Sequence, residues 1–261
     1  MNLADLTLLL PALVAGLLVV FSHVPLGREV VQRGIIFIDL AIAQIAGVGV
    51  IAARLLDLES PIAIQLFAGA AALAGALLLA WTDRRMGMLQ EPLIGVMFVL
   101  AATGGLMLLA QDPHGGDALK DMLAGQILWV DTGQLVWSAL ILVPCGLLWL
   151  LAGRYLGNLG FYGIFAISIT TSVQLVGVYL VFASLVIPAL AARHWHGRQA
   201  LAWALGLGAS GFTAGLVCSL YWDLPAAPLI VWCLALFALL LSAGRGRPRA
   251  ARLGIDTDLS D

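Results

Sequence analysis

The feature that most constrains this chain is a series of apolar segments of about the length that crosses a lipid bilayer. About 20 helical residues are needed to cross roughly 30 Å of hydrocarbon. Runs that approach or exceed this length are residues 4–21, 34–53, 62–81, 92–110, 134–151, 161–190, 201–220 and 229–243. Hydrophobic residues make up 62% of the 261 residues and charged residues only 11%. The sequence therefore predicts an all-α, polytopic transmembrane bundle.

The runs leave little chain outside the membrane. We expect one transmembrane domain over residues 1–244 and a cytoplasmic tail of basic and acidic residues over 245–261. No phosphate-binding loop, Ser/His/Asp arrangement or dinucleotide glycine pattern occurs, so the sequence does not indicate an enzyme or a nucleic-acid partner. The cysteines lie inside apolar runs without metal-site spacing and are interpreted as core thiols; they are Cys145, Cys218 and Cys233.

The positions of the basic residues predict the orientation. Positive residues accumulate in cytoplasmic loops. One topology places eleven of the 13 Lys and Arg residues on the same side. They are Arg28, Arg33, Arg84, Arg85, Arg154, Arg193, Arg198, Arg245, Arg247, Arg249 and Arg252. The N-terminus is then expected outside and the C-terminus in the cytoplasm.

The run 161–190 is too long for a single crossing without a strong tilt. As one helix its 30 residues would span about 45 Å, which needs a strong tilt. A break near Gly177 would give two short spans, and the chain would cross the membrane nine times. One long, tilted helix would give eight crossings and would place Arg154 outside. We expect about eight to nine spans with a broken helix near Gly177, because a break keeps Arg154 and Arg193 on the same side.

Polar side chains inside the membrane mark the candidate pathway. Asp39 and Gln44 interrupt the second apolar run, and a charged group there is costly unless it faces a bundle interior or a wet cavity. Gln126 and Gln174 are further candidates for the lining of a substrate pathway. The alternatives are that Asp39 pairs with Arg33 or another arginine, and that the glutamines form hydrogen bonds between helices.

Five segments resemble the bacterial metal-type ABC permeases, the integral subunits of zinc, manganese and iron importers. They are VPLGREVVQRGIIF with the adjoining AIAQIAGVG, EPLIGVMF, MLAGQILWV, QLVGVYLVFASLVIPALAAR and YWDLPAAPLIV. These segments occur in the family's order between residues 24 and 231. The resemblance implies a multi-pass subunit of the bacterial cytoplasmic (inner) membrane.

The sequence departs from the family at its metal-binding positions. The family's Asp and His fall on Leu40 and Gln44, and a His of some members falls near Val99. Zinc and similar metals prefer His, Cys or carboxylate ligands, usually four. The metal ligands are therefore unknown, and the pathway is expected to be a poor zinc site. A chelated or weakly ligated ion is an alternative cargo.

The resemblance also implies partners. They are an ABC ATPase, a periplasmic or extracellular substrate-binding protein, the lipid bilayer and a second copy of the chain in a homodimer. ATP would be used by the ATPase, and this chain would bind no cofactor. The family's ATPase-docking stretch is shortened here to residues 153–160, where Arg154, Tyr155 and Asn158 are the candidates for coupling.

The expected function is that of the permease subunit of an ABC importer for a divalent metal ion or a metal complex. It would work by ATP-driven alternating access. The alternative is a secondary transporter, or a stand-alone membrane subunit, without an ATPase. In that case Asp39 would act as a proton-linked carboxylate.

Overall fold

The structure, a computed structural model, describes residues 3–58, 60–110, 116, 123, 125 and 127–243. Within these ranges all regular elements are helices, which confirms the predicted all-α class. The elements are α1 (Leu3–Arg33), α2 (Ile38–Leu55), α3 (Pro61–Met86), η1 (Gly87–Leu89), α4 (Gln90–Leu109), η2 (Ile127–Trp129), α6 (Thr132–Val176), α7 (Val178–Ala191), α8 (Gly197–Trp222) and α9 (Ala226–Ala243). The predicted tail over 245–261 lies outside the described residues, as does Gln126.

Helix α1 is longer than its apolar run suggested. The run ends at residue 21, but the helix continues through Pro25 to Arg33. Pro25 removes one intrahelical hydrogen bond, a loss that neighbouring helices in a membrane bundle compensate. The added turns carry Val24, Leu26 and Val30, all fully buried. Burial of these side chains explains why the helix extends past the proline.

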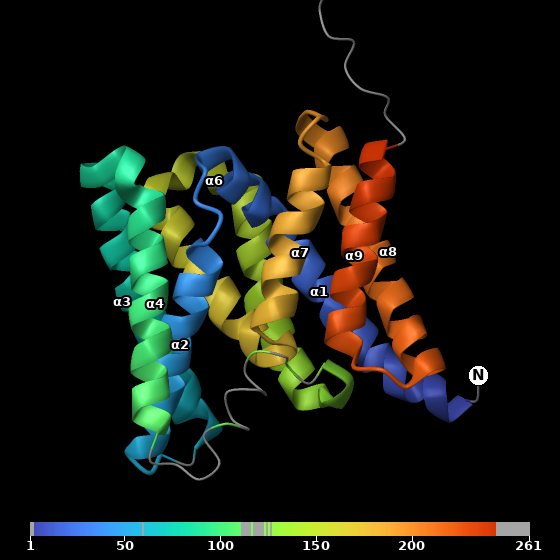
Figure 1. Cartoon of the computed structure of the whole chain (residues 1–261), viewed down its shortest axis with the longest axis horizontal. Coiled ribbons are helices and arrows are strands. Elements are labelled where there is room, and N and C mark those ends of the chain that lie inside the picture. Colours follow the sequence, from blue (N-terminus) through green and yellow to red (C-terminus); the bar gives the residue numbers. More distant parts are fainter. Residues whose placement is uncertain are drawn as a thin grey trace, which may run out of the picture.

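Two long helical segments turn back on themselves. Gly87 (φ 45°) lies at the turn between α3 and α4, and Gly157 (φ 59°, ψ −167°) is non-helical inside α6. Positive φ costs other residues about 1–2 kcal/mol, which explains glycine at these turns. Figure 1 shows α6 reversing direction at the upper side of the bundle. Residues 153–160, expected as a loop, are therefore helical on both sides of Gly157.

In the part of the chain that the structure describes, six segments are long and apolar enough to cross a membrane, as judged by length and composition. Two of them, Pro61–Leu109 and Thr132–Val176, contain the turns just described, and the shorter apolar helix Val178–Ala191 is counted separately. The number of eight to nine crossings stays a prediction. The expected break near Gly177 is present, since α6 ends at Val176 and α7 begins at Val178.

The helices form two lobes around a shared centre (Figure 1). Helices α2, α3 and α4 pack together on one side, and α8 and α9 pack together on the other. Helix α1 contacts α6, α7 and α8 and lies behind α7 in this view. Small residues allow the closest approach: a Cβ added at Gly27 of α1 would overlap the carbonyl oxygen of Leu185 in α7.

The arginine-bearing helix ends lie on one side of the bundle. Figure 1 shows the last turns of α1, α3, α7 and α9 and the reversal of α6 at the upper side. Arg33 ends α1, Arg84 and Arg85 lie in the last turn of α3, and Arg154 precedes the reversal of α6. This arrangement is what the predicted orientation requires, and the orientation itself stays a prediction.

Candidate functional site

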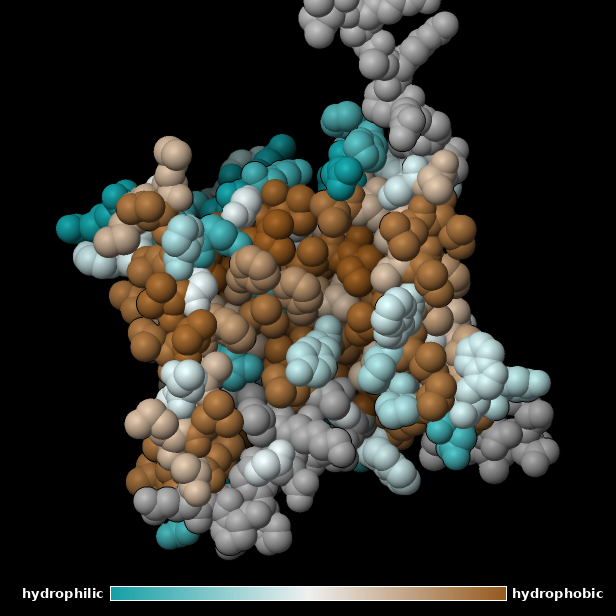
Figure 2. All heavy atoms as spheres, in the orientation of Figure 1, coloured by the Kyte–Doolittle hydropathy of each residue, from teal (hydrophilic) through white to brown (hydrophobic). Residues whose placement is uncertain are grey.

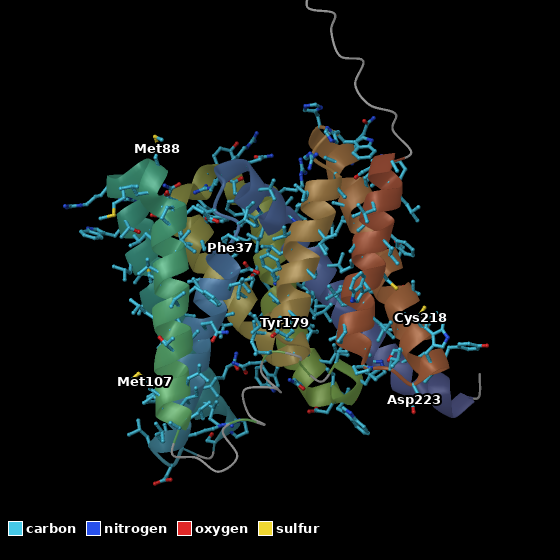
Figure 3. All side chains as sticks on the ribbon, in the orientation of Figure 1. Phe37, Met88, Met107, Tyr179, Cys218 and Asp223 are labelled. Carbon is cyan, nitrogen blue, oxygen red and sulfur yellow. The ribbon has the colours of Figure 1, made fainter. Side chains whose placement is uncertain are left out.

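A groove of about 660 Å³ opens between the two lobes. Helices α2, α4, α7 and α9 line it, together with Leu123. Its lining residues are Leu40 and Gln44 from α2, Phe98, Ala102 and Leu106 from α4, Val178, Tyr179, Phe182, Ala183 and Ile187 from α7, and Ala227, Pro228, Val231 and Trp232 from α9. Figure 2 shows the mainly hydrophobic face between α4 and α9, and Figure 3 shows Tyr179 on it. This volume lies within the roughly 300–1,000 Å³ typical of small-molecule sites.

The spacing along α2 explains which of its side chains reach the groove. Leu40 and Gln44 are four residues apart and therefore lie on the same helix face. Both line the groove. Gln44 is only 6% exposed, and its amide makes no hydrogen bond to a described residue. The sequence prediction that Gln44 faces a cavity agrees with this position; whether substrate contacts it stays a prediction.

The break in the chain at Gly177 shapes the opposite wall. Gly177 has φ 85° and ψ 162°, so the chain leaves the helical path and α7 starts with a new direction. The first residues of α7, Val178 and Tyr179, then line the groove. Behind the break, a Cβ at Gly125 would overlap the carbonyl of Val176, so this chain crossing requires glycine. The interrupted helix therefore lies next to the cavity.

Asp39 lies on a different side of α2 from the groove. It is 1% exposed, and its Oδ1 atom has no hydrogen-bond partner among the described residues. Glu91 lies at the same end of α2, because its side chain bonds to the backbone of Phe37, two residues before Asp39. The Oε1 atom of Glu91 accepts a hydrogen bond from the backbone N–H of Phe37 at 3.2 Å, whereas its Oε2 atom is buried without a partner. The two carboxylates form a second polar position at the start of α2 and α4.

The alternative that Asp39 pairs with Arg33 does not describe this structure. The Nε atom of Arg33 donates to Glu29 at 2.7 Å, and its guanidinium lies 4.3 Å from the ring centroid of Phe161. Nη1 of Arg33 donates to Oδ1 of Asn158 at 2.9 Å. Arg33 therefore contacts Glu29, Phe161 and Asn158. Asp39 and Glu91 are the acidic residues at the start of α2 and α4.

Gln174 does not line the groove. Gln174 is exposed, and its backbone carbonyl accepts a hydrogen bond from Nε2 of Gln134 at 3.0 Å. Gln126 lies outside the described residues. A pathway role for either glutamine stays a prediction without support from the groove.

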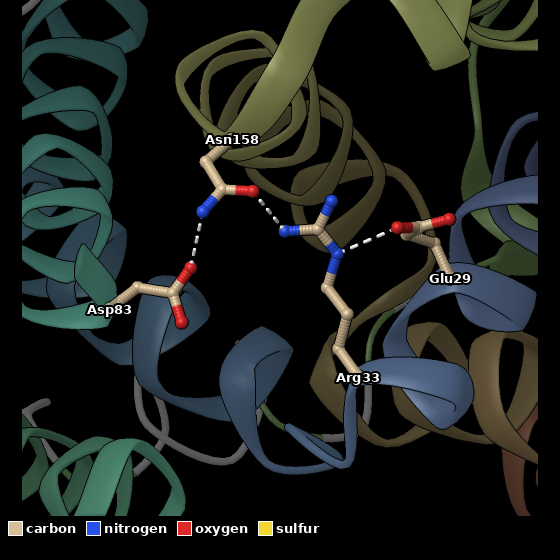
Figure 4. Close-up of polar contacts among 4 residues, drawn as sticks. All are labelled: Glu29, Arg33, Asp83 and Asn158. Atoms are coloured by element: carbon tan, nitrogen blue, oxygen red, sulfur yellow. Dashed lines mark hydrogen bonds and ion pairs between the residues drawn. The ribbon is translucent and has the colours of Figure 1, made fainter. Parts of the chain in front are cut away.

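The three expected coupling residues have different environments. Arg154 and Tyr155 are exposed, and the guanidinium of Arg154 lies 4.5 Å from the Tyr155 ring centroid. Asn158 points into the molecule, where its Nδ2 donates to Asp83 at 2.7 Å while its Oδ1 accepts from Arg33 (Figure 4). Arg154 and Tyr155 are available to a partner, whereas Asn158 connects α1, α3 and α6.

His23 is a buried ionisable residue that the sequence analysis did not identify. It is fully buried in α1; its Nδ1 lies 2.9 Å from Oγ of Ser22, and its Nε2 has no described partner. The apolar run was ended at residue 21, so His23 was not counted as part of a span. The sequence feature that could have identified His23 is its position just before Pro25, inside a segment that lies in the membrane.

The described lining of the groove offers few ligands to a metal ion. Its described lining contains no carboxylate, imidazole or thiol. No group of three or more His, Cys, Asp or Glu side chains that could hold a metal occurs among the residues the structure describes. Of the positions aligned with family ligands, Leu40 and Gln44 line the groove, whereas Val99 is 53% exposed beside the groove residue Phe98. The site fits an apolar ligand with few polar contacts.

The sequence model of the ABC 3 transport family matches residues 5–161 and 154–245, nearly the whole chain. The chain belongs to the ABC 3 transport family. Its members are permeases, so this chain is a multi-pass membrane subunit of an ABC-type transporter. ATPase and substrate-binding partners follow from membership of this family.

Two solved structures share the fold. PsaBC from Streptococcus pneumoniae, solved in complex with Fab, superimposes with a TM-score of 0.68 at 19% identity over 90% of each chain. An inward-facing structure described as a metal-chelate type ABC transporter gives a TM-score of 0.68 at 14% identity, over 90% of this chain and 86% of that chain. These similarities place the ABC 3 family chain within a known permease architecture.

Proposed function

We propose that this chain is the permease subunit of an importer for a divalent metal ion (zinc, manganese or iron) or a metal complex. The observation that carries the proposal is the ABC 3 family match over nearly the whole chain. The groove supports it, because it is a cavity at the junction of two helical lobes where a cargo could lie. The bacterial inner membrane is the proposed location.

The proposed mechanism is alternating access. Hydrolysis of ATP takes place in the partner, and this chain contributes the moving walls. The groove has α2 and α4 on one side and α7 and α9 on the other. A rocking motion of these pairs would close the groove at one membrane face and open it at the other. The helix break at Gly177 places an irregular segment beside the moving wall, as in other transporters with interrupted helices.

The proposed ATPase contact is the exposed turn around Arg154 and Tyr155. Both side chains lie at the reversal of α6, on the arginine-bearing side of the bundle. Leu151 and Tyr155 are 76% and 73% exposed, so an apolar surface is available for docking beside the charge of Arg154. A substrate-binding protein would dock on the opposite side, and a second copy of the chain would complete the importer.

A proton-coupled transporter is the second candidate. It is favoured by one observation: the side chain of Asp39 is fully buried, that of Glu91 is partly buried, and each has one buried oxygen that lacks a described partner. A carboxylate inside a membrane bundle is a candidate for proton binding. This reading requires no ATPase.

The two candidates are separated by purification and uptake. The full chain is purified from its native membrane, and co-purifying proteins are tested for ATPase activity. Cellular zinc, manganese and iron are then measured by elemental analysis with and without the chain. Associated ATPase activity and ATP-dependent accumulation would support the importer. Accumulation that follows the proton gradient, persists without ATP and occurs with no associated ATPase would support the second candidate instead.

A further inference from the structure

The chemistry of the groove restricts what it can bind. Its described lining offers aromatic faces from three helices, Phe98, Phe182 and Trp232 among them, and no charged side chain. A hydrated divalent ion gains nothing from such walls, since it needs oxygen, nitrogen or sulfur ligands to replace its water. Apart from the amide of Gln44, the described walls therefore offer an ion no ligand, and an ion that carries its own ligands fits them better.

Gln44 adds a polar requirement. Its side chain is more than nine-tenths buried, faces the groove, and makes no hydrogen bond to a described residue. Its amide atoms are open to the groove, and enclosing them without a partner would cost about 1–3 kcal/mol. A lipid acyl chain in the groove would impose that cost, whereas a ligand with a hydrogen-bonding atom would avoid it. The occupant is therefore expected to combine apolar faces with at least one polar atom.

We propose that the groove binds an uncharged metal chelate, in which flat apolar ligands enclose the ion and one polar atom pairs with Gln44. This inference rests on the proposed importer function and specifies its substrate class. The aromatic side chains would pack against the faces of the chelate, and its size is limited by the cavity of about 660 Å³. The described lining does not provide the ligands that a bare zinc, manganese or iron ion requires.

The test measures binding to the purified full chain in lipid nanodiscs. The probes are radioactive zinc as the free ion, and the same isotope in its neutral complex with two 8-hydroxyquinoline molecules. Empty nanodiscs correct for partition into lipid. We expect saturable binding of the complex to the protein and none of the free ion at the groove.

Variants locate the binding. Gln44→Leu and Phe182→Ala should each weaken binding of the complex at least about tenfold, the effect of losing about 1.4 kcal/mol. Val99→Ala, next to the groove residue Phe98 but outside the lining, is the matched control and should bind normally. One variant removes a polar group and the other removes an aromatic group. Weaker binding in both could not be explained by misfolding of one variant alone.

Three results would overturn the inference. They are free zinc binding that is lost in Gln44→Leu, binding of the complex no greater than to empty nanodiscs, and binding insensitive to both groove variants. The importer proposal is tested separately by ATP-dependent accumulation of any of the three metals. If free-ion uptake is ATP-dependent and the complex does not bind, the importer stands and the chelate inference fails.

Discussion

At the scale of single residues, Asn158 connects three helices that are distant in sequence. It accepts a hydrogen bond from Arg33 at the end of α1 and donates one to Asp83 near the end of α3. Both bonds involve a charged group, and such hydrogen bonds contribute more than neutral ones. The sequence analysis placed Asn158 in a docking turn because residues 153–160 correspond to the family's ATPase-docking stretch. The structure gives it internal contacts that no local pattern indicates.

Replacing Asn158 should therefore affect stability. Asn158→Ala removes both hydrogen bonds and leaves Asp83 and Arg33 each with one contact fewer, so we expect a loss of about 1–3 kcal/mol in the free energy of unfolding. The measurement is thermal unfolding in nanodiscs. Arg154→Ala, on the same segment but exposed, is the control and should change stability by less than about 0.5 kcal/mol. An equal loss in both variants would contradict the internal role of Asn158.

Arg154 and Tyr155 should show the opposite behaviour. Both are exposed at the reversal of α6. Tyr155→Ala removes an exposed aromatic side chain of the kind that dominates protein interfaces, where truncation costs about 2 kcal/mol or more at central positions. We expect weaker ATPase co-purification with unchanged thermal unfolding. Normal recovery of the ATPase with Tyr155→Ala would move the docking site elsewhere.

Asp39 is the residue whose role most needs a direct test. Asp39→Asn keeps the shape of the side chain and removes its charge, so insertion should be unaffected. If the charge acts in transport, uptake should fall about tenfold, equivalent to about 1.4 kcal/mol in the barrier. Membrane amount and metal uptake are measured together. Asp57→Asn, the same change at an exposed residue after α2, should leave uptake intact. Full uptake with Asp39→Asn would remove Asp39 from the pathway.

At the scale of helices, close contact between α1 and α7 depends on Gly27. A Cβ there would overlap the backbone carbonyl of Leu185, which cannot move without shifting α7. Residues of the same helix end, Val24 and Leu26, are fully buried. Small residues at such crossings let membrane helices approach closely. The Pro-Leu-Gly segment is therefore part of a packed helix rather than a loop.

Gly27→Ala should destabilise the bundle by about 1–3 kcal/mol, the usual cost of overpacking. The matched control is Gly163→Ala in α6, where an added Cβ meets no atom within 4 Å. This control should be neutral or slightly stabilising, because alanine favours helices more than glycine does. Unfolding of both variants in detergent or nanodiscs gives the comparison. A neutral Gly27→Ala would mean that α1 and α7 are further apart than described.

At the scale of the whole molecule, the predicted orientation can be tested with two exposed positions. Met88 and Asp223 lie towards opposite ends of the bundle (Figure 3). Met88 is 99% exposed in η1, on the arginine-bearing side. In a background with the three native cysteines replaced by alanine, a membrane-impermeant thiol reagent should label Asp223→Cys in intact cells. Met88→Cys should react only after the membrane is opened. The reverse pattern would invert the topology derived from the positive residues.

The sequence by itself determined the fold class, because membrane-length apolar runs can satisfy their backbone hydrogen bonds in lipid as helices. It also indicated the break at Gly177 from the excess length of one run, and the cavity-facing position of Gln44 from its polarity. Only the tertiary structure decided that Leu40 and Gln44 share a groove with α7 and α9, that Asp39 lies with Glu91, and that Asn158 binds Arg33 and Asp83. These contacts join residues that are far apart in the chain. Hydropathy does not specify how apolar segments pack against one another, because lipid and the protein interior are equally apolar surroundings.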